Sequence, residues 1–166
     1  MNRVLIAVII ISFTVTSCAQ GKYGVVKSQA YFRESAPGAV AVNEMGNQQY
    51  TVDTIYSVFI EAKPGKSPEW KKAWIGKNTY NVLSTIMATP HIAGMKQNAD
   101  EDVILSASGS NQLIQLNLEK TIAERIPEKY QEQTTSKAIL LEGVLKDKIV
   151  HLVISSMEPL RGRENQ

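Results

Sequence analysis

The chain has 166 residues, of which 18 are basic and 16 acidic, and its formal net charge is +2 at pH 7. This near balance argues against binding to nucleic acids or other polyanions, because such proteins carry an excess of Lys and Arg. The length is that of one ordinary domain with its own hydrophobic core, and the single cysteine, Cys18, excludes a disulfide bond within the chain.

The first residues follow the order of a secretory signal. Arg3 provides a positive charge, residues 4–15 (VLIAVIIISFTV) are mostly apolar, and the small residues Thr16 and Ser17 precede Cys18. A membrane-spanning helix needs about 20 apolar residues, so this run is too short to span a bilayer. Its length suits the apolar core of a signal peptide, and the small residues behind it suit a cleavage site.

Val15, Thr16, Ser17 and Cys18 resemble the lipobox of bacterial lipoproteins, which reads aliphatic, small, small, cysteine. The resemblance implies that the Cys18 sulfur receives a diacylglyceryl group, that residues 1–17 are removed, and that the new N-terminus is acylated, with palmitate as an expected chain. A thiolate is the nucleophile suited to this attachment, and two or more acyl chains hold a protein firmly in a bilayer. An ordinary signal peptide cut nearby and a buried core cysteine are the two alternatives.

The same resemblance implies a location. Ala19 and Gln20 carry no acidic sorting signal, which in the best-known rule for this family favours the outer membrane, facing the periplasm. We therefore expect a lipidated cysteine with a short tether over residues 18–22, a folded domain over 23–157 and a flexible tail over 158–166.

The rest of the chain has mainly the pattern of β-strands, in which every second side chain faces the same way. Residues 23–33 predict a first strand with Val26, Ala30 and Phe32 on one face. Residues 39–42 (AVAV) predict a short second strand, which ends before a Gly-Asn turn.

Residues 51–63 (TVDTIYSVFIEAK) show the clearest alternation of the whole chain. The turn residues Pro64 and Gly65 end this strand. Its more apolar face contains Val52, Thr54, Tyr56, Val58, Ile60 and Ala62.

Three later segments have the pattern of hairpins, with an apolar strand on each side of a turn that is rich in Gly, Asn or Asp. They are residues 73–87, with the turn at 76–78; residues 102–119, with the turn at 109–111; and residues 137–155, with the turn at 146–148.

Two segments depart from this pattern. Ser67 and Pro68 suit the N-cap and the first position of a short helix, and residues 119–137 are charged and interrupted by Pro127, which predicts a crossover loop with about one helical turn on either side. Because helical periodicity is almost absent elsewhere, the sequence predicts an all-β fold. We expect a β-sandwich of about seven or eight short antiparallel strands, immunoglobulin- or transthyretin-like.

No catalytic constellation is predicted. His91 follows a proline in an expected loop, and His151 lies in the strand pattern IVHLVI, where a structural histidine with a satisfied hydrogen bond is favoured. The run SASGS at 106–110 does not match a nucleophile elbow, and PGKS at 64–67 lacks the first glycine of a phosphate-binding loop. A small hydrolase that uses His91 or His151 with an acidic partner is the less favoured alternative.

The acidic run NADED, residues 98–102, contains the metal candidates Asp100 and Asp102. A calcium loop needs ligands at alternate positions and a later bidentate Glu, and the spacing here differs from that pattern. A solvated loop is therefore the favoured interpretation, and no cofactor is predicted.

Three aromatic residues are candidates for a binding surface, namely Trp70, Trp74 and Tyr80. Exposed aromatic rings bind saccharides or peptides through flat, rigid faces, whereas buried rings belong to the core. Trp70 and Trp74 are four residues apart, which places them on the same face of a helix or of a regular strand, so periodicity does not separate the two options. Core packing is favoured.

The sequence thus predicts a non-enzymatic, lipid-anchored protein of the bacterial cell envelope that acts as a binding or adaptor module for other envelope proteins. Such a domain can bind a partner economically by adding a strand to an exposed sheet edge. A small-ligand or glycan binder that uses a surface tryptophan is the main alternative. The identity of the partner and the oligomeric state stay open.

Overall fold

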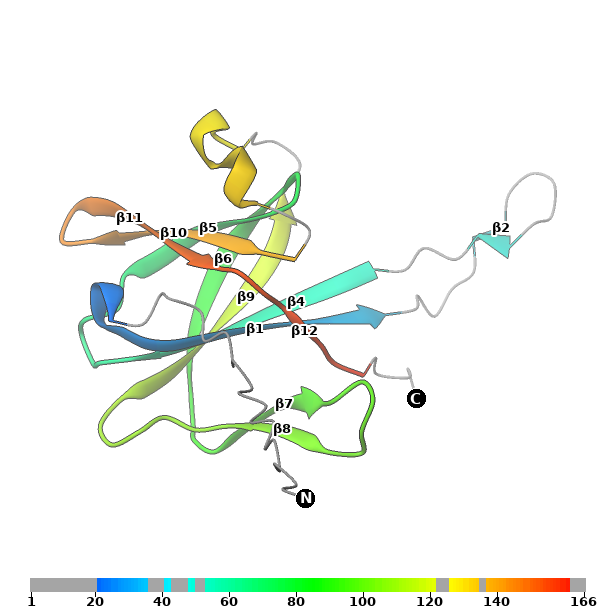
Figure 1. Cartoon of the computed structure of the whole chain (residues 1–166), viewed down its shortest axis with the longest axis horizontal. Helices are drawn as coiled ribbons and strands as arrows, with labels where there is room; N and C mark the ends of the chain where they lie inside the picture. The colour runs from blue at the N-terminus through cyan, green and yellow to red at the C-terminus, as the bar shows by residue number, and fades with distance from the viewer. Residues whose placement is uncertain are drawn as a thin grey trace, which may run out of the picture.

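The computed structural model describes residues 21–35, 41–42, 48–49, 53–121, 126–134 and 137–161. These residues form an all-β fold, which confirms the predicted class, and their only helical elements are two short 3-10 helices (Figure 1). The helices are η1 (Lys22–Gly24) and η2 (Glu128–Gln133). The strands are β1 (Val25–Ser35), β2 (Ala41–Val42), β3 (Gln48–Gln49), β4 (Asp53–Ala62), β5 (Glu69–Ile75), β6 (Asn78–Met87), β7 (His91–Met95), β8 (Asp102–Leu105), β9 (Gln112–Thr121), β10 (Ile139–Leu145), β11 (Lys148–Ile154) and β12 (Glu158–Pro159).

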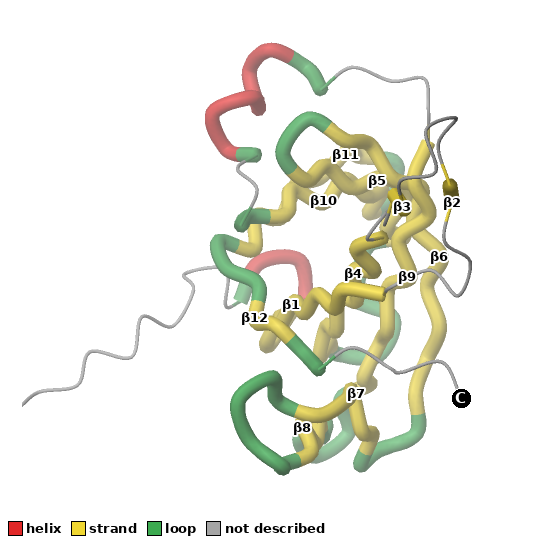
Figure 2. Tube along the Cα trace, turned by 90° about the vertical axis from the view of Figure 1, so that its right-hand side faces the viewer, coloured by secondary structure: helices red, strands yellow, loops and turns green. Residues whose placement is uncertain are grey.

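Eight strands form one curled sheet in the order β11-β10-β5-β6-β9-β4-β1-β12. Figure 2 shows the curl: β10, β11 and β5 make one layer, β1, β4 and β12 the opposite layer, and β6 and β9 join the two at the bend. The sandwich-like arrangement that the sequence predicted is therefore built from two halves of a single sheet. All neighbours in this sheet are antiparallel except β1 and β12, which are parallel.

The space between the two layers holds the main hydrophobic core. The predicted alternation of β4 is confirmed, because Val58, Ile60 and Ala62 are buried in this core and Tyr56 packs against it. Burying such side chains provides most of the free energy that favours folding. The core comprises Val25, Ala30, Val58, Ile60, Ala62, Trp70, Ala73, Ile75, Tyr80, Val82, Leu116, Ile139, Leu141, Leu152 and Ile154.

A second, smaller hydrophobic cluster lies on the outer face of β1, β4 and β9, where the β7–β8 hairpin covers the sheet (Figure 1). It contains Tyr31 and Phe59, whose rings pack edge to face with their centroids 6.0 Å apart, and Leu113 of β9. Leu105 of β8 and Leu160 pack against them from the covering side. Both faces of β4 are thus buried at its C-terminal end.

Two β-bulges shift the faces that simple alternation predicts. In β1 the pairing with β4 skips Val26, so the interior position belongs to Val25, which is 1% exposed, and not to Val26 as predicted. In β5 the pairing with β10 skips Lys71. Trp70 therefore faces the main core between the two layers, whereas Trp74 lies on the outer face of the sheet, where it is also buried. The prediction that the two side chains share one face is wrong.

Two of the three predicted hairpins are confirmed, and one is wrong. β5 pairs with β6 across the turn Gly76-Lys77, and β10 pairs with β11 across Lys146-Asp147, where the φ angles of 49° and 60° are those of a tight two-residue hairpin turn. In contrast, β8 pairs with β7 and β9 pairs with β4 and β6, so the turn at 109–111 connects two different sheets.

Other predicted boundaries change as well. No helix follows Ser67, because Glu69 already begins β5. The expected tail is partly folded, since β12 pairs with β1, and the Leu160 N–H donates a 2.8 Å hydrogen bond to the carbonyl of Phe32. At the other end, the Gly21 N–H donates to the carbonyl of Val25 at 2.9 Å, so the domain begins inside the predicted tether.

Candidate functional site

Part of β6 lacks a partner strand on one side. Its residues 79–87 pair with β9, but only residues 78–81 pair with β5. From 82 to 87, no strand in the described part of the chain pairs with the side that faces away from β9. In Figure 2, β6 runs along the right-hand margin of the molecule. We call residues 82–87 the open edge.

The open edge arises because β5 turns away from β6. The residues of β5 that precede Lys72 do not pair with β6. Trp70 and Glu69 still pair with β10, on the other side of the bulge at Lys71. A bulge increases the local twist and bends its strand. The bend leaves the second half of β6 paired with β9 alone.

The backbone groups that face the open side follow from the hairpin geometry. Ile75 and Asn78 flank a two-residue turn, so they form a hydrogen-bonded pair. Because residues of an antiparallel strand alternate in the direction of their N–H and C=O groups, the groups of Val82, Ser84 and Ile86 point to the open side. A partner strand can form hydrogen bonds with these three residues.

The side chains of the open edge make it unusual for a soluble domain. Leu83 is 52% exposed and Ile86 is 64% exposed, and Ser84 and Thr85 between them are also exposed. β6 contains no charged residue and no proline. Natural proteins usually protect exposed strand edges with charged residues or proline, because an unprotected edge pairs with other chains. The open edge therefore has the unpaired backbone and the apolar, uncharged side chains that strand addition requires.

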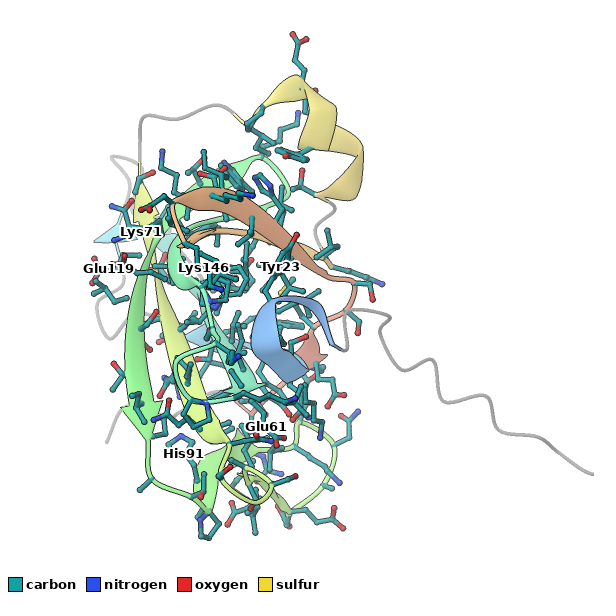
Figure 3. All side chains as sticks on the ribbon, turned by 90° about the vertical axis from the view of Figure 1, so that its left-hand side faces the viewer. Tyr23, Glu61, Lys71, His91, Glu119 and Lys146 are labelled. Atoms are coloured by element: carbon teal, nitrogen blue, oxygen red, sulfur yellow. The ribbon has the colours of Figure 1, made fainter. Side chains whose placement is uncertain are left out.

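The end strands of the sheet are less available. β11 lies against β1 across the seam of the curled sheet, and β12 is only two residues long. η1 and the β10–β11 turn lie at the same end of the molecule, as the labels of Tyr23 and Lys146 in Figure 3 show.

The three candidate binding aromatics are buried, so they do not form the exposed surface that the tryptophan-based ligand-binding alternative requires. Trp70 and Trp74 are each 2% exposed and Tyr80 is 5% exposed. Tyr80 packs edge to face against Tyr56, and burial raises its pKa to about 12. Core packing, the favoured interpretation, is confirmed for Trp70 and Tyr80, which belong to the main core, whereas Trp74 is buried on the outer face of the sheet. Neither indole N–H has a hydrogen-bond partner in the described part of the chain.

The metal candidates do not form a ligand set. Asp100 forms an ion pair with Arg161 at 2.9 Å, and Asp102 is an exposed residue of β8 that pairs with Met95. Among the residues that the structure describes, no three His, Cys, Asp or Glu side chains converge as a metal site requires. The structure therefore gives no support to the prediction of a metal at Asp100 and Asp102.

The favoured interpretation of His151, a strand histidine with a satisfied hydrogen bond, agrees with its contacts, and one of its partners is an acidic residue, as the hydrolase alternative requires. Its Nε2 lies 2.9 Å from Glu142 Oε2, and its Nδ1 lies 3.1 Å from the Tyr130 hydroxyl. Glu142 and His151 lie opposite each other in the β10–β11 hairpin, and Tyr130 comes from η2. Both ring nitrogens thus have a partner: Glu142 on the neighbouring strand, and Tyr130, which connects η2 to the outer face of the sheet. His91 packs instead beside Phe59, with ring centroids 5.5 Å apart.

The sequence did not predict Glu142 as a partner of His151, because a three-residue turn was expected at 146–148. A two-residue turn at Lys146-Asp147 would have put Glu142 directly opposite His151. Nothing in the sequence pattern pointed to Tyr130, which lies far from both residues along the chain.

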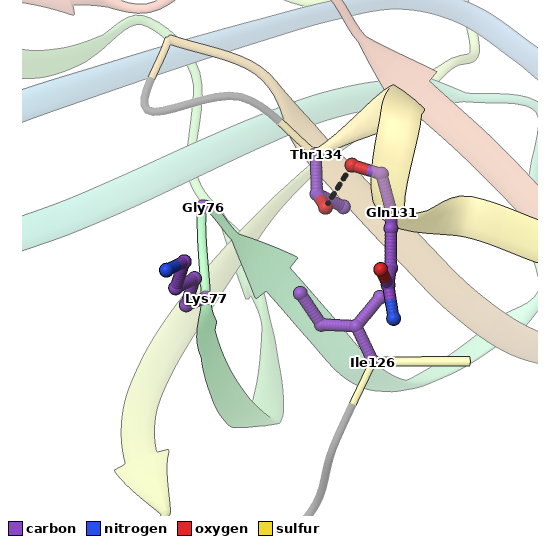
Figure 4. A pocket seen from close by; sticks show the side chains of 5 residues that line it. All are labelled: Gly76, Lys77, Ile126, Gln131 and Thr134. Carbon is purple, nitrogen blue, oxygen red and sulfur yellow. Dashed lines mark hydrogen bonds between the residues drawn. The ribbon is translucent and has the colours of Figure 1, made fainter. Parts of the chain in front are cut away.

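A cavity of about 480 Å³ lies between the β5–β6 turn and η2. Figure 4 shows its lining, which includes Gly76 and Lys77 from the turn, Ile126 before η2, and Gln131 and Thr134 from the end of η2. The Thr134 hydroxyl donates a hydrogen bond to the Gln131 carbonyl at 3.1 Å. This bond closes the last turn of η2. Among the described lining residues of the cavity, Lys77 alone is titratable, so they form no cluster of titratable groups.

The predicted lipid attachment site, Cys18, and the preceding lipobox residues Val15, Thr16 and Ser17 lie outside the described residues. In the described ranges, no helix has the length and apolar character needed to cross a bilayer. Comparison of the chain with family models, with curated proteins and with solved structures finds no match.

Proposed function

We propose that this protein is a lipid-anchored binding or adaptor module of the bacterial cell envelope, and that it is not an enzyme. The acyl chains on Cys18 hold it at a membrane, with the outer membrane, facing the periplasm, as the favoured location. The open edge of β6 receives an extended strand from another envelope protein.

Support for the anchor comes from the N-terminal residues. Arg3, the apolar residues 4–15 and the lipobox-like ending at Cys18 follow the order that a lipoprotein signal requires. The folded part begins at Gly21, and the chain from Cys18 to Gly21 spans at most about 11 Å. An acylated Cys18 would therefore keep the domain directly beside the lipid surface.

The observation that carries the binding function is the open edge. Three residues there present backbone donors and acceptors that no described strand pairs with, in a strand without charges and with two exposed apolar side chains. Strand addition satisfies the backbone groups and buries the apolar side chains in one step. The partner that fits is an extended, uncharged segment with β-branched or aromatic residues.

Site-specific crosslinking in cells tests this function. A photoreactive amino acid at Thr85, an exposed residue of the open edge, is expected to capture one partner in high yield. The same probe at Ile149, which is 67% exposed on β11, serves as the positional control. Ser84→Pro, which removes a backbone donor of the open edge, is expected to abolish the crosslink.

The anchor is tested in the same experiment. Cys18→Ser should release the protein from the membrane fraction and reduce capture of a membrane-bound partner. Equal yields at positions 85 and 149, or a yield that Ser84→Pro does not change, would exclude the open edge as the binding surface.

A further inference from the structure

A second cavity, of about 420 Å³, lies at one end of the space between the two layers of the sheet. Its walls come from the end of β1, the start of β4 and the chain around β12, which lie together in Figure 1. The described residues that line it are Phe32, Thr54, Tyr56, Lys137, Met157 and Pro159.

The cavity continues the hydrophobic interior. Tyr56 and Met157 pack against the main core, and Phe32 lies on the same face of β1 as the buried Ala30. Below them, Tyr56 packs on Tyr80, with ring centroids 5.7 Å apart. The floor and sides of this cavity are thus apolar and aromatic, and they rest on the packed core. Cavities of this size and composition are typical of small-molecule sites.

The rim of the cavity carries one charge. Lys137, an exposed residue just before β10, is the single ionisable side chain with a full charge at neutral pH among its described lining residues. The nearby Glu158 pairs with Tyr31, which belongs to the cluster on the outer face of β1, so its side chain lies on the face opposite the cavity. Lys137 takes part in another interaction of the structure, and an ammonium group has three N–H donors, so it can also bind a carboxylate.

We propose that this cavity binds a small apolar carboxylate, with its hydrocarbon part between Phe32, Tyr56 and Met157 and its carboxylate at Lys137. Thr54, which is exposed at the rim, provides a hydroxyl within the same lining. This site is separate from the open edge of β6, so it adds ligand binding to the proposed function and does not depend on it.

Titration of the folded domain with decanoate and with decanol, followed by calorimetry, tests the proposal. Decanoate is expected to bind with a stoichiometry of one and more tightly than decanol. Lys137→Gln should weaken decanoate binding about three- to fivefold, the effect of a partly exposed ion pair, and should leave decanol binding unchanged. Lys77→Gln, at the other cavity, is the matched control and should change neither.

A second variant tests the location independently of charge. Thr54→Trp places a large ring in the cavity from an exposed position and should abolish binding of both compounds, with an unchanged unfolding transition as the check on folding. Absence of saturable binding to the wild-type protein overturns the proposal. So does a loss of binding in Lys77→Gln that Lys137→Gln does not show. An unchanged ratio of decanoate to decanol affinity in Lys137→Gln overturns the assignment of a carboxylate.

Discussion

Replacement of Glu61 by Gln measures how strongly a buried charge holds the loop at 106–111 against β4. Glu61 is 6% exposed, and its Oε1 accepts hydrogen bonds from the Ser108 backbone N–H at 2.9 Å and from Asn111 Nδ2 at 2.6 Å. A hydrogen bond to a charged group contributes about 1.5–3 kcal/mol, and a neutral one about 0.5–1.5 kcal/mol. Glutamine keeps the acceptor oxygen but loses the charge, so the expected loss is about 2 kcal/mol for the two bonds together.

The effect has a defined pH dependence. Burial raises the pKa of Glu61, but the hydrogen bonds from Asn111 and Ser108 and the charge of Lys27 outweigh it and lower the pKa below the usual value. Because the folded pKa lies below the unfolded one, the carboxylate stabilises the fold above the unfolded pKa, and this contribution is lost as the pH falls through the folded pKa. The difference between wild type and Glu61→Gln should therefore be full at pH 7 and shrink below about pH 4.

Urea unfolding at pH 7 and at pH 3 provides the measurement. Glu119→Gln, at an exposed position of β9 that Figure 3 shows well away from Glu61, is the control and should stay within about 0.5 kcal/mol of wild type. Equal stability of wild type and Glu61→Gln at pH 7 would refute the reasoning. A difference that persists undiminished at pH 3 would also refute it, because the charge would then not be its source.

Four further outcomes are expected. Ser84→Pro should lower the free energy of unfolding by urea by less than about 1 kcal/mol, because the Ser84 N–H faces the open side. Thr85→Pro removes a hydrogen bond to β9 and should cost about 3 kcal/mol or more. Similar costs for the two variants would contradict the assignment of the Ser84 N–H to the open side. Gly143→Ala should cost about 1–3 kcal/mol, since an added Cβ would lie 2.9 Å from a carbonyl oxygen and from a tryptophan ring; an unchanged melting temperature would contradict this packing. His151→Ala should lose about 1–2 kcal/mol and keep the phenotype of the intact gene, and a stably folded variant without that phenotype would favour the hydrolase alternative. Radiolabelled palmitate should enter the wild-type protein but not Cys18→Ser, and an unlabelled wild type that retains residues 1–17 would exclude lipidation.

The strands were predictable wherever alternation is regular and turn residues are explicit. Residues 51–63 met both conditions, and β4 occupies nearly the same range with the predicted face inside. The turn at Lys146-Asp147 was predicted one residue too long, at 146–148. Two non-glycine residues with positive φ are uncommon in such a turn.

The errors have a common physical origin in long-range pairing. The bulge at Lys71 reverses the faces of the residues before it, and a local pattern carries no signal for a bulge that depends on the neighbouring strand. β8 and β9 are correct as strands, but their partners are β7 on one side and β4 and β6 on the other. Pairing of this kind is decided by burial in the whole fold and not by the turn between two strands.

The open edge could not be predicted for the same reason. The sequence suggested strand addition in general terms, but it did not indicate which strand would lack a neighbour. That depends on the point where β5 leaves β6, and hence on the bulge at Lys71. The apolar and uncharged composition of β6 was visible in the sequence. It indicates a binding edge only when one side of the strand is known to be unpaired.

The outermost strands of the curled sheet, β11 and β12, are consecutive in the chain and are separated only by residues 155–157. β12, the last of the described strands, therefore leaves the layer of β10 and β11 and pairs with β1, the first of the described strands, so that it joins the two layers of the sheet. Contacts between such distant parts of a chain form late in folding. If the chain is exported unfolded, as the proposed lipoprotein signal requires, the pairing of β12 with β1 cannot form until almost the whole chain has crossed the membrane.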